Sequence, residues 1–402
     1  MWNNVKLKDI CKVFDDGNWI ESKDQSDDGI RLIQTGNIKF GTFADRKNKA
    51  RYVSEKTFKR LNCKEIFAGD ILVSRLPDPV GRACIIPKLS ERAITAVDCT
   101  IIRLNEICLP EYLNYFMQSP QYFIGIRKEI SGATRQRISR KNLGEILIPL
   151  PPLTEQQRIV SKLDIAFAGI DRTIDATQNN LKSSKIIFSK YLKNIFQTKR
   201  AEYTNSTIGK TCTIKSGTTV KPDIERAAGK IPYLKVADMN LKGNEKEITT
   251  SSRFLNIEDI RNNSIIEPGA TIFPKRGGAI ATNKKRIITT QTCIDLNIMS
   301  VLPKKKIILP KLLYYYFINI DLSKLGSGSS IPQVNNYDIE PLFISFPSKI
   351  EEQDKIINKI DELYTETNKL VNIYKNKVKY LIIFKNSFLS ECLNERKTKK
   401  IA

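Results

Sequence analysis

Apolar residues recur every three or four positions along two long stretches of the chain, residues 153–196 and 350–393. The first stretch contains one glycine, Gly169, and no proline, and the second contains neither. This spacing places a single apolar stripe along a helix of about 65 Å, at about 1.5 Å per residue. Because neither helix can bury so long a stripe alone, we expect the two helices to pair as an antiparallel coiled coil.

The remaining sequence consists of short β-branched runs, such as 71–73 and 270–273, separated by Gly, Pro, Asn and Asp. This pattern is typical of short strands and loops, with a helix expected near Pro110. Pro151, Pro152 and Pro347 precede the two helical stretches and favour helix initiation there. We therefore predict an α+β fold in four parts: an irregular α/β globule at 1–152, a long helix at 153–200, a second globule at 201–349 and a second long helix at 350–397.

The second half of the chain repeats the first at an offset of about 200 residues. Residues 30–38 resemble 231–239, 109–113 resemble 309–313, 131–134 resemble 327–330, and 155–164 resemble 352–361. Four landmarks in the same order indicate a duplication. Antiparallel helices would turn the second globule by about 180° relative to the first, so we expect pseudo-twofold symmetry within one chain.

The amino-acid composition excludes several classes of catalytic and metal-binding site. The chain has 402 residues, 66 Lys+Arg against 43 Asp+Glu, a net charge of +23 and no histidine. The absence of histidine excludes Ser-His-Asp and Cys-His catalysis and histidine-ligated metals. The eight cysteines are scattered without a C-x-x-C pair, and no apolar run approaches the length needed to cross a bilayer. We expect a cytoplasmic protein without a membrane segment.

The excess positive charge favours a polyanionic partner, and its distribution favours duplex DNA. The net charge is +7 for residues 1–152 and +8 for residues 201–349, so both globules share the excess. Two basic surfaces in one chain suit two contacts on one duplex. A generally lysine-rich composition with solvated side chains is the alternative explanation.

The sequence segments that partly match enzymatic or metal-binding motifs lack residues or surroundings that those motifs require. Gly209-Lys210-Thr211 resembles the end of a phosphate-binding loop, but Thr204 stands where that loop needs glycine. Glu21-Ser22-Lys23 and Glu395-Arg396-Lys397 lack the setting of a magnesium-dependent nuclease. We therefore expect no catalytic residue, no metal ligand and no cofactor of the chain's own.

Planar and cationic side chains beside glycine- or proline-containing loops are candidate DNA contacts, because such groups bind base edges and phosphates. They fall in three loop segments of each repeat: 34–37, 75–82 and 131–137 in the first, and the region of 235, 275–286 and 327–336 in the second. The predicted DNA-binding residues are Gln34, Thr35, Asn37, Arg75, Arg82, Arg135, Gln136, Arg137, Lys235, Lys275, Arg276, Lys284, Lys285, Arg286, Gln333 and Asn335.

The chain resembles the specificity subunits of type I restriction-modification systems. The resemblance rests on the duplicated globule-helix layout, on residues 148–157 (IPLPPLTEQQ), on 69–75 (GDILVSR) and on Ser131-Gly132. Repeat two departs from it, with one proline and an added residue at 346–353 and Gly269-Ala270 in place of Gly69-Asp70.

The resemblance implies two target recognition domains, each reading half of a bipartite, asymmetric double-stranded DNA site. The helices would set the spacer and dock two modification subunits, which methylate adenine with S-adenosylmethionine. Restriction subunits, which use ATP and Mg²⁺, would complete the assembly. Two alternatives stay open: a DNA-modifying enzyme, either nuclease or methyltransferase, and a coiled-coil scaffold that binds nucleic acid without sequence preference.

Overall fold

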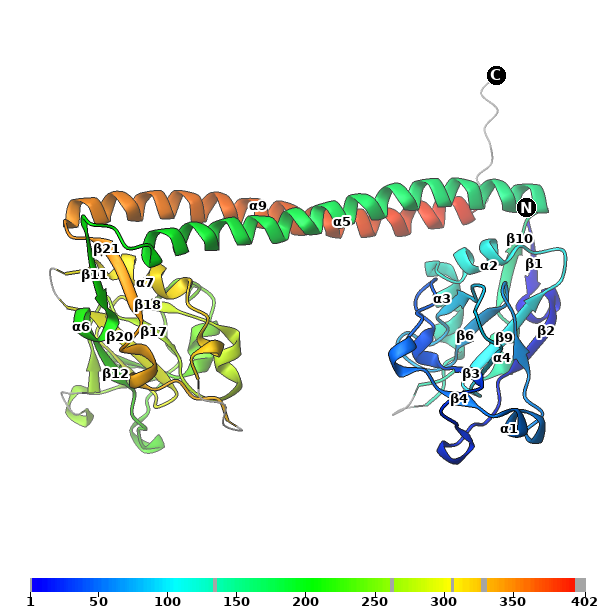
Figure 1. Cartoon of the computed structure of the whole chain (residues 1–402), viewed down its shortest axis with the longest axis horizontal. Coiled ribbons are helices and arrows are strands. Elements are labelled where there is room, and N and C mark those ends of the chain that lie inside the picture. The colour runs from blue at the N-terminus through cyan, green and yellow to red at the C-terminus, as the bar shows by residue number, and fades with distance from the viewer. Residues whose placement is uncertain (1, 133–135, 261–263, 305–306, 327–330, 395–402) are drawn as a thin grey trace, which may run out of the picture. The chain divides into compact units, whose positions relative to one another are not determined.

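The fold of the chain was obtained as a computed structural model, which describes residues 2–132, 136–260, 264–304, 307–326 and 331–394 (Figure 1). The chain divides into two compact units. Unit 1 comprises Met1–Thr177 with Asn376–Ala402, and unit 2 comprises Gln178–Lys375. Each unit therefore contains one globule together with part of each long helix.

The described residues of unit 1 form three small sheets. β1 (Asn3–Lys6) pairs with β10 (Leu147–Leu150). A four-stranded antiparallel sheet has the order β2 (Cys11–Asp16), β9 (Cys99–Leu104), β6 (Ile71–Ser74) and β7 (Ala83–Ile85). The other four-stranded sheet is mixed. It has the order β4 (Tyr52–Val53), β3 (Ile30–Ile33), β8 (Ala93–Thr95) and β5 (Glu65–Ile66), and its strands β3 and β8 run parallel. The short helices are α1 (Glu55–Arg60), α2 (Pro110–Phe116), α3 (Pro120–Glu129) and α4 (Arg140–Gly144).

Unit 2 repeats this plan. β11 (Tyr203–Thr207) pairs with β21 (Phe343–Pro347). One sheet has the order β12 (Cys212–Ser216), β20 (Ile298–Pro303), β17 (Thr271–Pro274), β18 (Arg286–Ile288) and β14 (Glu247–Ile248). The other has the order β15 (Phe254–Leu255), β13 (Ile231–Leu234), β19 (Thr292–Ile294) and β16 (Ile265–Ile266). The short helices are α6 (Ile208–Thr211), α7 (Pro310–Ile318) and α8 (Asn336–Ile339).

The two long helices are α5 (Leu153–Gln197) and α9 (Ile350–Leu393). In unit 1, Lys385 of α9 pairs with Asp171 of α5 at 2.6 Å, and Lys162 lies over the Phe388 ring at 5.1 Å. Higher numbers on one helix meet lower numbers on the other, so the pairing is antiparallel. In unit 2, Phe188 of α5 contacts Tyr364 of α9 with ring centroids 5.5 Å apart.

The apolar stripes are buried in the cores of the globules as well as against each other. In unit 1 the main core combines Ile159, Leu163 and Phe167 of α5 with Leu389 of α9 and the side chains of α2. In unit 2, Leu192 and Phe196 of α5 and Ile360 of α9 pack on the aromatic helix α7. The predicted α+β fold of two globules and two paired long helices is confirmed. The pseudo-twofold relation between the globules stays a prediction.

The duplication extends to single hydrogen bonds at the junctions between globule and helix. Gln156 is fully buried; its side chain accepts from the Leu109 amide at 2.8 Å and donates to the Ile107 and Pro151 carbonyls at 2.9 and 2.8 Å. Gln353 is equally buried and makes the same three bonds in unit 2, to Leu309 at 2.8 Å and to Ile307 and Pro347 at 2.9 Å. The glutamine of each junction thus fixes the start of a long helix to its own globule.

Candidate nucleic-acid interface

The three loop segments predicted in repeat one converge in unit 1. The Arg82 guanidinium donates to the Thr35 and Ile38 carbonyls at 2.9 and 2.8 Å and to the Leu76 and Pro79 carbonyls at 2.7 and 3.1 Å. It therefore ties 34–37 to 75–82. The Ile138 amide donates to the Arg75 carbonyl at 3.3 Å, which brings the end of the third segment to the same place.

The corresponding segments converge in unit 2 as well. The Val334 amide donates to the Lys275 carbonyl, and the Gly277 amide donates to the Pro332 carbonyl, both at 2.8 Å. Arg286 donates to the Met239 carbonyl at 2.9 Å, which ties this loop to the short helix Val236–Asn240 that follows Lys235. Each unit thus presents one cluster of three loops, which we call its recognition cluster.

Four of the predicted contact residues are buried and already bonded. Asn37, Arg75, Arg82 and Lys285 are at most 7% exposed. Asn37 donates to the Ala44 carbonyl, Arg75 to the Val97 carbonyl, and Lys285 to the Ile320 carbonyl. These bonds hold the loops in place, so all four residues help to position the loops, while the buried Arg75 Nε atom has no hydrogen-bond partner.

Five other predicted residues are half-buried and partly engaged. The Gln34 main-chain amide donates to the Asn37 side-chain oxygen at 3.0 Å, and the Lys235 side chain pairs with Glu225 at 2.6 Å. Lys284 bonds to Asn240, Arg286 donates to the Lys285 carbonyl at 2.7 Å, and Asn335 caps α8. These side chains hold the local loop conformation and keep a part of their surface in solvent.

The remaining predicted residues form the accessible part of the two clusters. Gln136, Arg137 and Arg276 are exposed, whereas Thr35, Lys275 and Gln333 are half-buried. A backbone bridge joins Arg137 to Ser131 in unit 1, and another joins Arg276 to Gln333 in unit 2. Arg135 and residues 327–330 lie outside the described residues.

Sequence reasoning missed two kinds of residue in the unit 1 cluster. Arg46, Lys47 and Lys49 are exposed, and Arg46 lies so close to Gly36 that a side chain at Gly36 would collide with it. The available signal was a group of cations at 46, 47 and 49, in the segment that follows the predicted loop 34–37. Asp16, at the end of β2, pairs with the buried Arg75 at 3.2 Å, and the sequence alone did not show that this carboxylate lies beside the predicted loops.

The cysteines form no disulfide in this structure. All eight are free thiols. Burial raises the pKa of Cys84, Cys99 and Cys108 to about 12, so these side chains stay protonated at neutral pH. Within the described part of the chain, no group of three or more Cys, Asp or Glu residues is placed to hold a metal ion.

Lys285 should make the stability of the protein depend on pH. Burial lowers its pKa from 10.5 to about 7. Between these values the unfolded chain binds the proton and the folded chain does not, so the free energy of unfolding should rise with pH. We expect a gain of about 2 kcal/mol between roughly pH 7.5 and 9, measured by urea denaturation. Lys285→Met should flatten this slope, and equal slopes for the two proteins would contradict the assignment.

Fold and clusters together define a duplicated protein in which each half presents a basic loop cluster on a globule fixed to paired long helices. The chain belongs to the type I restriction modification DNA specificity domain family, because the sequence model of that family matches residues 1–183 and 201–380. The predicted resemblance is thereby confirmed. So is the expectation that the chain is a specificity component rather than a catalytic one.

Curated relatives match over part of their length. The chain is 28% identical over 169 residues to the type I restriction enzyme EcoKI specificity subunit of Escherichia coli strain K12, covering 40% of this chain and 36% of that protein. It is 32% identical over 128 residues to the putative type I specificity subunit S.HindORF215P of Haemophilus influenzae, covering 31% of each. The chain thus spans about a third of the length of these relatives.

Solved structures show the same fold at low identity. A chain from a study of complex assembly and conformational transition of the type I R-M system superposes with a TM-score of 0.79 at 17% identity, covering 98% of this chain and 97% of that one. The HsdS subunit of Thermoanaerobacter tengcongensis gives a TM-score of 0.59 at 17% identity, covering 98% and 96%. Among the described residues, no helix is long and apolar enough to cross a membrane.

Proposed function

We propose that the chain reads a bipartite, asymmetric site on double-stranded DNA, with each recognition cluster contacting one half. The observation that carries this proposal is the same convergence of three loops in both units, built from different side chains. Arg137 occupies in unit 1 the place that Gln333 occupies in unit 2, since the following residues, Ile138 and Val334, bond to Arg75 and Lys275. Loops with the same main-chain arrangement but different side chains are suited to bind two half-sites of different sequence.

Each cluster offers both kinds of group that DNA recognition needs. Exposed lysines such as Lys47 and Lys49 act as point charges toward phosphates, and they fix the position of the protein on the duplex. Planar side chains such as Arg137 and Gln333 form paired hydrogen bonds with base edges in the major groove. The buried Arg82 keeps the loops in place, so that their exposed groups need little reorganisation on binding.

Exposed apolar side chains support a role of the long helices in docking two modification subunits. On α9, Tyr380, Ile383 and Phe384 in unit 1 are 52–65% exposed. In unit 2, Ile187 of α5 is 61% and Ile373 of α9 is 58% exposed. Apolar side chains at helical spacing on an already paired helix favour further helices as partners.

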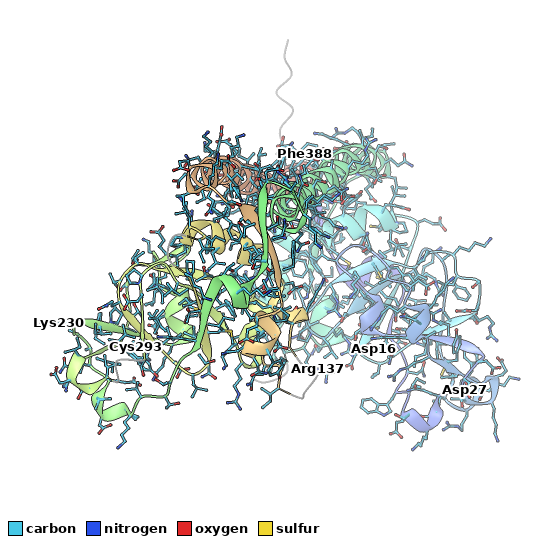
Figure 2. All side chains as sticks on the ribbon, turned by 60° about the vertical axis from the view of Figure 1, so that its left-hand side comes forward. Asp16, Asp27, Arg137, Lys230, Cys293 and Phe388 are labelled. Carbon is cyan, nitrogen blue, oxygen red and sulfur yellow. The ribbon has the colours of Figure 1, made fainter. Side chains whose placement is uncertain are left out.

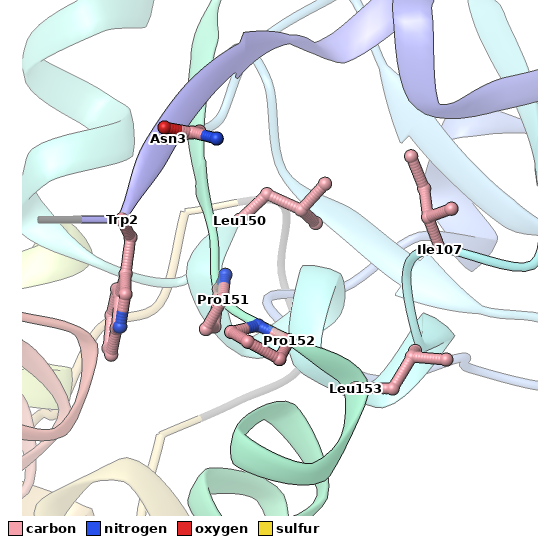
Figure 3. Close-up of a pocket in the computed structure, with 7 residues that line it drawn as sticks. All are labelled: Trp2, Asn3, Ile107, Leu150, Pro151, Pro152 and Leu153. Atoms are coloured by element: carbon pink, nitrogen blue, oxygen red, sulfur yellow. The ribbon is translucent and has the colours of Figure 1, made fainter.

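A second apolar surface of unit 1 is a groove at the junction between its globule and α5 (Figure 3). Its volume is about 550 Å³, and it is lined by Trp2, Asn3, Ile107, Leu150, Pro151, Pro152 and Leu153. Ile107 and Leu153 are 49% and 40% exposed there. We propose that the methyltransferase subunits cover these surfaces and that the helices set the spacer between the half-sites. S-adenosylmethionine, ATP and Mg²⁺ then belong to the modification and restriction subunits, in the cytoplasm.

Exchange of one globule tests the bipartite assignment. Residues 201–349 would be replaced by the equivalent globule of a family member with a different target, and methylated sites would be mapped by genome sequencing in cells that also contain the partner subunits. One half of the site should change completely while the other half and the spacer stay the same. The reciprocal exchange of residues 1–152 is the matched control.

The result also separates the two alternatives. A change in both halves, or in neither, contradicts the modular assignment. A chain that cleaves or methylates DNA without partners would be an enzyme in its own right. A chain that binds all duplexes equally with its partners present would be a non-specific scaffold.

A further inference from the structure

The last residue of β2 in unit 1 and the last residue of β12 in unit 2 have matching main-chain hydrogen bonds around them but different side chains. β2 ends at Asp16 and β12 ends at Ser216, each followed by a glycine. A side chain on Gly17 would collide with the Thr95 carbonyl, and one on Gly217 would collide with the Asp295 carbonyl. The Gly17 amide donates to the Cys99 carbonyl at 3.0 Å, and the Gly217 amide donates to the Ile298 carbonyl at 3.1 Å.

The neighbouring strand ends correspond in the same way. The Arg75 amide donates to the Asp98 carbonyl at 2.9 Å, and the Lys275 amide donates to the Asn297 carbonyl at 2.8 Å. The side chains then meet across the gap: Arg75 pairs with Asp16 at 3.2 Å, and Lys275 donates to the Ser216 hydroxyl at 2.7 Å. An ion pair in unit 1 is therefore replaced by a lysine and a hydroxyl in unit 2.

The residues around this pair change together. Thr100 stands opposite Asp16 in the β2–β9 register and donates to its carboxylate at 2.7 Å. Met299 stands opposite Ser216 in the β12–β20 register and offers no such donor. The preceding residue changes from Asp15, which pairs with Lys64 and Arg140, to Lys215. Unit 1 thus surrounds the Asp16 carboxylate with hydrogen-bond donors, whereas unit 2 has the contact between Lys275 and Ser216 there and no carboxylate at 215 or 216.

The Asp16 carboxylate remains within reach of a ligand. Its side chain is 22% exposed, and its recorded partners are Thr100, Arg75 and, at 4.0 Å, Arg140. Burial raises its pKa, and the charges of Arg75 and Arg137 oppose this effect. Arg137 directly precedes Ile138, whose amide donates to the Arg75 carbonyl at 3.3 Å, so Arg137 adjoins the Asp16–Arg75 pair. The Arg137 side chain is exposed, and Figure 2 labels it together with Asp16. The Asp16 carboxyl group thus offers a hydrogen-bond acceptor near the planar donor of Arg137.

Resting on the proposed function, we propose that Asp16 and Arg137 together read one G·C base pair in the half-site bound by unit 1. The carboxylate accepts from the cytosine amine, and the guanidinium donates to O6 and N7 of the guanine. Unit 2 presents Lys275 and Gln333 at the matching place, so its half-site carries no requirement for a cytosine amine there.

Selection from a duplex library with randomised half-sites tests this pairing. The full chain, alone and with its methyltransferase partners, would be used at one fixed salt concentration, because affinity depends strongly on salt. Asp16→Asn keeps the shape of the side chain but places an N–H donor where the carboxylate would accept a hydrogen bond from the cytosine amine. We expect about a 10- to 100-fold loss of preference for G·C at one position, with the other positions unchanged.

Asp15→Asn is the matched control, because Asp15 is the adjacent carboxylate and is held by Lys64 and Arg140. It should leave every base preference as it is. The double variant Ser216→Asp with Lys275→Arg should bring a G·C preference into the other half-site. Thermal melting of each variant separates a loss of folding from a loss of reading.

Three outcomes are decisive. A loss of preference at one base pair for Asp16→Asn, absent in Asp15→Asn, supports the pairing. A bipartite motif that Asp16→Asn leaves intact, or an equal loss on all sequences in both variants, overturns the pairing and leaves the proposed function standing. Selection of no motif by the unmodified chain and its partners overturns both.

Discussion

Arg82→Ala should unfold the recognition cluster of unit 1 and lower the free energy of unfolding by about 3 to 5 kcal/mol. The Arg82 side chain is 7% exposed and donates to four main-chain carbonyls from two loop segments. Its removal leaves these carbonyls without their donor in a desolvated place and opens a gap between the segments. Urea denaturation measures the loss, and binding to a cognate duplex should lose its sequence preference in the same half-site.

Two comparisons make this expectation specific. Arg82→Lys keeps the charge but lacks the planar fork, so it should recover little of the lost stability. Arg46→Ala removes an exposed arginine of the same cluster and should change stability by no more than about 0.5 kcal/mol while weakening DNA binding. Equal stability of Arg82→Ala and Arg46→Ala would show that the buried fork does not hold the loops.

Gln156→Ala and Gln353→Ala should each cost about 3 to 5 kcal/mol of unfolding free energy, because each leaves one amide and two carbonyls unpaired in a buried junction. Hydrogen exchange gives a local readout. The Leu109 amide should lose protection in Gln156→Ala, and the Leu309 amide should lose it in Gln353→Ala, since each donates to the substituted side chain.

Gln157→Ala is the matched control for unit 1, because Gln157 is the exposed neighbour on the same helix turn. It should leave both stability and exchange close to those of the unmodified chain. The glutamines would have no anchoring role if Gln156→Ala and Gln157→Ala unfolded at the same urea concentration.

The sequence predicts the architecture well because the signals are long and repeated. Helical spacing over more than forty residues predicts α5 and α9, and the duplication shows that the two globules share one plan. The parallel pairing of β3 with β8 was beyond sequence reasoning. These strands are short and far apart in the chain, and their register depends on contacts that no local pattern carries.

The sequence predicts which loop segments come together, but it does not predict which of their side chains are buried. The segments around Gln34, Arg75 and Arg137 do converge, but the arginine chemistry that marked Arg75 and Arg82 serves the interior of the loops. These arginine side chains are buried because the loop segments pack on one another, and the sequence of a single segment does not show this. The reverse holds for Asp16, whose importance is visible only beside Arg75 and beside its counterpart Ser216.

The two glutamine junctions also make the halves of this chain interchangeable parts for genetic recombination. Gln156 and Gln353 bond to main-chain atoms only, so the junction does not depend on which side chains the globule carries. A crossover within 153–156 or 350–353 would join a globule from one source to a helix from another without losing any of these bonds. Under the proposed function, exchange of whole globules at these points would combine different half-sites while the glutamine joints stay unchanged.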